Sequence, residues 1–90
     1  MCRSIKTLFN FEPPATDEEI QAASLQFVRK LSGFTKPSKA NEQAFHDAVE
    51  QVTQVARVLL RSLETHAVPR DRATEAARAR AKAAARFAPA

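Results

Sequence analysis

The sequence predicts an all-α fold, a small helical bundle of three to four helices around one long central helix. Three observations support this prediction. The stretch from Lys39 to Thr65 contains no proline or glycine, and its apolar residues recur at the three- and four-residue spacing of one helical face. The composition has one glycine, no tryptophan or tyrosine and many alanines, which favours helices over sheets. A second amphipathic stretch, bounded by helix start and stop signals, precedes the long one.

The long helix over residues 39–65 sets the scale of the domain. It would be roughly 40 Å long, whereas a compact chain of this size has a radius of gyration of about 12 Å. One helix therefore crosses the whole molecule, and the other segments must cover its apolar stripe. The stripe consists of Phe45, Ala48, Val49, Val52, Val55, Ala56, Leu59, Leu60 and Leu63.

The opening segment predicts a short helix followed by an extended connection. Ser4 can cap this helix, and Asn10 can end it because asparagine tolerates the left-handed backbone conformation. Pro13-Pro14 then enforces extended backbone. The apolar positions of this short helix are Ile5, Leu8 and Phe9.

A helix over residues 17–32 follows. Thr16 and Glu19 form the pattern of a capping box, and Gly33 is a typical stop signal. The short loop after Gly33 predicts that this helix packs antiparallel to the long one. Its apolar face is predicted to consist of Ile20, Ala23, Phe27, Val28 and Leu31. We expect Ile20, Phe27 and Leu31 to meet Phe45, Val49 and Val52.

The remaining segments complete the predicted architecture. Ser38 is expected to cap the long helix, and Pro69 to occupy the first position of a final helix that extends to Phe87. Alanines dominate this final helix and bury little area, so we expect it to dock weakly. The apolar opening segment should therefore be what covers the far end of the long helix. The residues to be covered there are Leu59, Leu60 and Leu63.

Charge and composition divide the chain into a helical domain over residues 1–68 and a basic, alanine-rich helix or frayed tail over residues 69–90. The net charge of +4 lies entirely in residues 67–90, because the charges of the preceding residues cancel. A single cysteine, Cys2, fits a reducing compartment, and no apolar run is long enough to span a membrane. We expect a cytoplasmic protein that does not insert into membranes.

Several strings in the first half of the chain resemble a family of small, mostly bacterial proteins known as a domain of unknown function. The most specific is the opening, Met1-Cys2-Arg3, Ile5-Lys6 and Leu8-Phe9-Asn10-Phe11-Glu12-Pro13-Pro14-Ala15-Thr16. Further strings are Gln26-Phe27-Val28-Arg29-Lys30, Ser32-Gly33-Phe34, Lys36-Pro37-Ser38 and Ala40-Asn41. The resemblance implies a small autonomous domain and no particular activity, substrate or cofactor.

The residues give little support for enzyme chemistry, and we expect neither an enzyme nor a bound cofactor. His46 and Glu50 lie one helical turn apart, but two ligands do not make a metal site. No glycine-rich phosphate loop or nucleophile motif is present. Cys2 could be activated by neighbouring Arg3 if it became the terminal residue, although a packed small side chain is the ordinary interpretation.

The best candidate site is a basic loop that leads into the N-terminus of the long helix. Cations, free backbone N–H groups and the helix dipole would together favour an anion there, and an exposed phenylalanine could stack on a base. Its candidate residues are Arg29, Lys30, Phe34, Lys36, Ser38, Lys39 and Asn41. The alternative is that the lysines only solvate the loop, while Phe34 packs on the core.

Two function classes therefore remain. The first is a binding module for nucleic acid or another phosphate-bearing ligand, which acts through the basic loop. The second is a protein–protein interaction module, or a homodimer, that uses the long helix and exposed phenylalanines. The two differ in salt dependence, because counterion release drives nucleic-acid binding but not apolar association.

Overall fold

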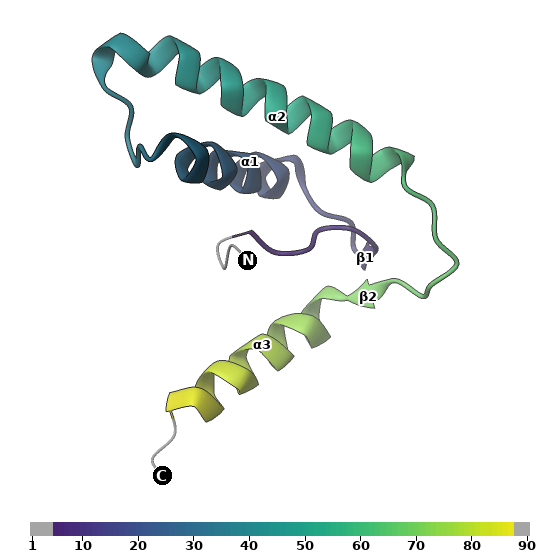
Figure 1. Cartoon of the computed structure of the whole chain (residues 1–90). Helices are drawn as coiled ribbons and strands as arrows, with labels where there is room; N and C mark the ends of the chain where they lie inside the picture. Colours follow the sequence, from purple (N-terminus) through teal and green to yellow (C-terminus); the bar gives the residue numbers. More distant parts are fainter. Residues whose placement is uncertain (1–4, 88–90) are drawn as a thin grey trace.

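The computed structural model describes residues 5–87, with side chains to residue 85. The fold is mostly helical, as predicted, but it also contains one short pair of strands (Figure 1). The order of elements is β1 (Phe11–Glu12), α1 (Asp17–Ser32), a 3-10 turn η1 (Lys39–Asn41), α2 (Glu42–Ser62), β2 (Arg70–Asp71) and α3 (Arg72–Phe87). None of the helices within the described residues is long and apolar enough to cross a membrane.

Local signals in the sequence account for the ends of α1. The Thr16 N–H donates to Glu19 Oε1 at 3.0 Å, and the Glu19 N–H donates to Thr16 Oγ1 at 3.2 Å, so the predicted capping box is present. At the other end Gly33 adopts φ 76°, and its N–H donates to the Arg29 carbonyl at 2.9 Å. The predicted bounds of this helix are confirmed.

The long helix begins slightly later and ends slightly earlier than its sequence pattern. Residues 39–41 form the separate turn η1, and α2 itself runs from Glu42 to Ser62. The expectation that Ser38 caps this helix is wrong. Ser38 instead precedes η1 and makes no side-chain bond to a helical N–H, because its Oγ accepts from Asn41 Nδ2 at 2.7 Å.

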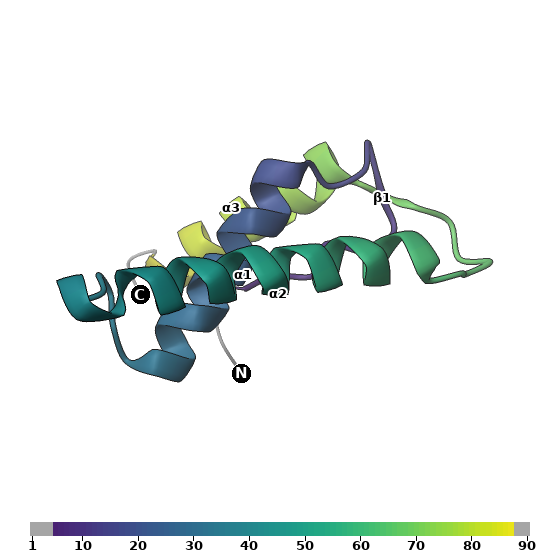
Figure 2. The same ribbon diagram turned by 90° about the horizontal axis from the view of Figure 1, so that it is seen from above.

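Helices α1 and α2 form an antiparallel hairpin, as predicted (Figure 1). Seen from above, they cross at a clear angle, so they diverge towards the far end of α2 (Figure 2). The core between them is small. Its buried members are Val28, Phe45 and Val49, with Leu25, Ala48 and Val52 packed against them.

The predicted apolar face of α1 is rotated relative to the observed one. Phe27 and Leu31 are 42% and 72% exposed, so the expectation that they enter the core is wrong. The buried residues are Ile20, Ser24 and Val28, at four-residue spacing. Ser24 is tolerated there because its Oγ donates to the Ile20 carbonyl at 2.9 Å, which satisfies the hydroxyl within the helix.

The opening segment is not helical over residues 5–10, contrary to expectation, and Ser4 lies outside the described residues. Asn10 does adopt a left-handed conformation, with φ 64°. Its carbonyl accepts from the Arg70 N–H at 2.8 Å, at the start of a parallel pairing of β1 with β2. Very short helices are marginal in water, so this long-range pairing prevails over the local helical pattern.

The final helix is present but begins later than predicted. Pro69 is not its first residue, because residues 70–71 are extended as β2. Asp71 takes the capping role: its Oδ2 accepts from the Thr74 N–H at 3.1 Å and from the Thr74 hydroxyl. These bonds lower the pKa of Asp71 below its ordinary value. Figure 1 shows α3 extending away from α2 on the opposite side of α1, so a bundle around α2 does not form within one chain.

Candidate functional site

Three surfaces of the described residues combine exposure with distinctive chemistry: the basic loop between α1 and α2, one side of α2, and a pocket beside α3. In the basic loop, Arg29 turns back, and its Nε donates to the Thr35 carbonyl at 3.0 Å. Phe34 is 39% exposed, and its N–H donates to Ser32 Oγ at 3.2 Å. Arg29 therefore orders the loop, and one of its N–H donors is used for the bond to the Thr35 carbonyl.

The other predicted residues of the basic loop fall into two groups, one hydrogen-bonded pair and three exposed lysines. Ser38 and Asn41 lie together through their side-chain hydrogen bond. The lysines at positions 30, 36 and 39 are exposed, and none of them is in an ion pair with a carboxylate of residues 5–85. The structure thus brings together Arg29 with Thr35, and Ser38 with Asn41. It leaves the lysines as separate exposed cations around the turn.

The second surface is one side of α2, which we call the uncharged flank. Helical geometry places its members within one arc of the helix, and no charged residue falls among them. Val55 is 70% exposed and Leu59 53%. The expectation that the opening segment covers the end of α2 is therefore wrong for Leu59, and also for Leu63, which is 43% exposed; Leu60 is partly buried and lines a small pocket with Phe9. The flank consists of Gln51, Val52, Val55, Val58, Leu59 and Ser62.

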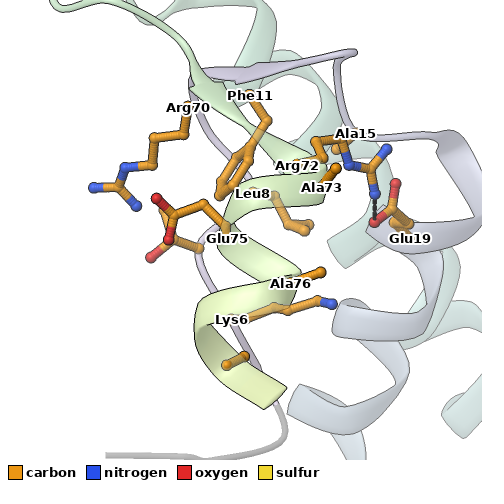
Figure 3. Close-up of a pocket in the computed structure, with 12 residues that line it drawn as sticks. Lys6, Leu8, Phe11, Ala15, Glu19, Arg70, Arg72, Ala73, Glu75 and Ala76 are labelled. Atoms are coloured by element: carbon orange, nitrogen blue, oxygen red, sulfur yellow. Dashed lines mark hydrogen bonds and ion pairs between the residues drawn. The ribbon is translucent and has the colours of Figure 1, made fainter. Parts of the chain in front are cut away.

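The third surface is a pocket of about 560 Å³ between the opening segment and α3 (Figure 3). Leu8 and Phe11 form one wall, and alanines of α3 form the other. Charged side chains surround this apolar interior. The lining residues are Lys6, Thr7, Leu8, Phe11, Ala15, Glu19, Arg70, Arg72, Ala73, Glu75, Ala76 and Ala79.

An ion pair between Arg72 and Glu19 closes the side of the pocket nearest α1, as the dashed line in Figure 3 marks. It joins the start of α3 to the first turn of α1, and Arg72 also donates to the Pro14 carbonyl at 3.4 Å. The pKa of Glu19 lies below its ordinary value, chiefly because the Thr16 N–H donates to the carboxylate. Hydrogen bonding and charge from Arg72 lower this pKa further, and desolvation opposes both.

This pKa shift predicts how the free energy of unfolding depends on pH. Because the folded-state pKa of Glu19 is depressed, its stabilisation is present above the unfolded-state pKa and is lost as the pH falls through the folded-state value. We expect Glu19→Gln to be less stable than the wild type near neutral pH, with the difference shrinking in acid. Urea denaturation from about pH 7 to pH 3 measures this. Glu18→Gln is the control, since Glu18 is exposed and makes no hydrogen bond among the described residues. An equal pH-dependent loss in both variants would contradict the assignment.

Sequence reasoning missed this pocket because its walls come from distant segments. Residues 6–15 and 70–79 meet through the strand pair and the hydrogen bond from Arg72 to the Pro14 carbonyl, and Asn10 Nδ2 donates to the adjacent Ala67 and Val68 carbonyls at 3.4 Å. One signal was available. Ala73, Ala76 and Ala79 recur at three-residue spacing, which marks one shallow face of α3.

The histidines and acidic residues considered as metal ligands do not form a metal site among the described residues. Residues 5–85 contain no group of three His, Cys, Asp or Glu side chains placed to hold a metal ion. His46 is exposed and meets the Phe45 ring edge-on, with the ring centroids 5.9 Å apart. Cys2 lies outside the described residues.

Comparison with known proteins supplies a family but no activity. Residues 1–78 match a family described as "Uncharacterized conserved protein (DUF2277)". No curated protein matches the chain, and no solved structure does. The match extends from the opening segment through the hairpin into the first two turns of α3, which includes most of the pocket lining. The chain therefore belongs to the DUF2277 family of uncharacterised conserved proteins.

Proposed function

We propose that the protein is a non-enzymatic interaction module that associates with a second copy of itself through the uncharged flank of α2. The observation that carries the proposal is the exposure of this flank. Val55, Val58 and Leu59 are each more than half exposed and lie on adjacent turns of the longest helix. A contiguous apolar surface of this kind usually marks an interface in a folded protein.

The surface area of the chain agrees with this proposal. A compact monomer of 9.9 kDa would expose about 5,200 Å², whereas this chain exposes 7408 Å². Its radius of gyration is 16.0 Å, against about 12 Å for a compact chain of this length. A stable dimer buries about 800 Å² on each partner, which is less than this excess summed over the whole chain.

The absence of charge on the flank favours a second copy as the partner. In a two-fold dimer the same patch faces itself, so a charge near the axis would meet its own copy. Here the described flank presents only aliphatic side chains, Gln51 and Ser62. Val55, Leu59 and Ser62 are spaced by four and three residues, as in the seam between packed helices. Two hairpins joined along α2 would place four helices together, which would complete the predicted bundle around the long helix.

Sedimentation equilibrium of the full chain tests the proposal. We expect the wild type to dimerise, and Leu59→Glu to weaken the dimer by at least about tenfold, because two carboxylates would be forced into an apolar contact. Gln54→Glu is the matched control. It adds the same charge to the other side of α2 and keeps an oxygen that can accept from Arg57.

The controls separate association from folding. Since Leu59 is 53% exposed, circular dichroism of Leu59→Glu should remain helical. A wild type that stays monomeric at millimolar concentration would overturn the proposal. So would a Gln54→Glu variant that dissociates as readily as Leu59→Glu.

The basic loop supports a second candidate function, the binding of nucleic acid or another phosphate-bearing ligand. The supporting observation is that Lys30, Lys36 and Lys39 stay exposed and unpaired among the described residues, around a turn that Arg29 orders. Titration with inorganic phosphate or a short oligonucleotide should first perturb the backbone amides of residues 36–41. A double variant, Lys36→Glu with Lys39→Glu, should abolish the effect, and the wild-type affinity should fall steeply with salt. Perturbation confined to residues after Pro69 would rule out the loop.

A further inference from the structure

We propose that the pocket beside α3 binds a small amphipathic anion, with an apolar body against the alanine face and an oxyanion head at Arg70. This inference is independent of self-association, because the pocket and the uncharged flank share no residue. Its volume of about 560 Å³ lies within the range of small-molecule sites in proteins.

The walls of the pocket suit the apolar body of such a ligand. Ala73, Ala76 and Ala79 face it from α3, and each ends at a methyl group, so the space remains open between the helix and the opposite wall. Leu8 and Phe11 provide that opposite wall (Figure 3). Both are only half-buried, so a ligand there would remove apolar surface from water.

The charges around the pocket favour an anion. Its two carboxylates already have partners, because Glu19 pairs with Arg72, and Glu75 pairs with Arg78 at 3.3 Å. Lys6 and Arg70 also line the pocket, and neither lies within ion-pair distance of a carboxylate of residues 5–85. Two cations outside these ion pairs therefore remain for a ligand.

Arg70 is the better positioned of the two cations. It is the strand partner of Phe11, and its guanidinium carbon lies 5.7 Å from the centroid of the Phe11 ring. Stacking uses the face of a guanidinium and leaves its N–H groups, which lie in the plane, free to donate. Phe11 can thus hold Arg70 in place for a two-pronged contact with a carboxylate or phosphate.

The same charges argue against a purely apolar occupant. A hydrophobic side chain from another protein would cover Arg70 and Lys6 without compensating them, and desolvating an unpaired cation is costly. An anionic head group avoids this cost. Carboxylates and phosphates share this chemistry, and the experiment below distinguishes them.

Titration of the full chain with decanoate, below its micelle concentration and followed by amide NMR, tests the inference. We expect shifts centred on Leu8, Phe11 and residues 70–79. Decanol, which has no charge, and acetate, which has no tail, should each bind at least about tenfold more weakly. Decyl phosphate supplies the second arm: whichever of the two anions binds more tightly identifies the head group.

Two variants locate the site. Arg70→Gln should weaken binding of the anion at least about tenfold but leave decanol unchanged. Ala76→Leu should fill the pocket and abolish binding, whereas Ala77→Leu is the control, because Ala77 is exposed and outside the lining. Leu59→Glu should bind as the wild type does. Equal binding of decanol and decanoate, equal effects of Ala76→Leu and Ala77→Leu, or no binding of either anion would overturn the inference.

Discussion

Phe45→Ala is expected to remove most of the stability of the hairpin. Phe45 is 6% exposed and is the only aromatic residue in the buried cluster with Val28 and Val49. Truncating a large buried aromatic side chain costs about 3–5 kcal/mol, and a domain of this size has about 5–10 kcal/mol in all. Thermal and urea denaturation should therefore show a steep loss of cooperative unfolding.

Phe27→Ala is the matched control for this prediction. It removes the same side chain from the neighbouring helix, where the ring is 42% exposed and outside the buried cluster. We expect it to lower the free energy of unfolding by less than half as much as Phe45→Ala, because less apolar surface is lost. If Phe27→Ala were the more damaging of the two, the rotation of α1 described above would be wrong.

Asn10→Val is expected to release β2 and α3 from the rest of the chain. A β-branched residue at a left-handed position such as φ 64° costs about 1–2 kcal/mol, and the side-chain bonds to the Ala67 and Val68 carbonyls are lost as well. At 3.4 Å these bonds are long, so we assign about 1 kcal/mol to the two together. The expected total is about 2–3 kcal/mol.

Hydrogen exchange at the Arg70 amide reports this release directly, because that N–H donates to the Asn10 carbonyl at 2.8 Å. Asn10→Gly separates the two causes. Glycine accepts the left-handed conformation without strain but lacks the side chain, so we expect it to cost about 1 kcal/mol and to retain most of the protection at Arg70. Equal loss of protection in both variants would mean that backbone conformation at this position contributes nothing.

The sequence by itself determined those features that depend on neighbouring residues. Thr16 and Glu19 form their capping box, and Gly33 ends α1, because each of these motifs is complete within a few residues. The apolar stripe of α2 likewise predicted a long helix whose centre is confirmed. The basic loop was recognisable from composition, and its role as a binding site remains a prediction.

Only the tertiary structure decided which faces meet and which distant segments pair. The face that α1 buries includes Ser24 and leaves Phe27 exposed, which no period of apolar residues encodes. The pairing of β1 with β2 joins residues almost sixty positions apart and overrides a weak local helix, since long-range hydrogen bonds are gained only after the chain has folded back. That pairing and the contacts of Arg72 with Glu19 and the Pro14 carbonyl bring the walls of the pocket together. Local propensities thus specify the helices of this protein, whereas packing and long-range hydrogen bonds specify its candidate binding surfaces.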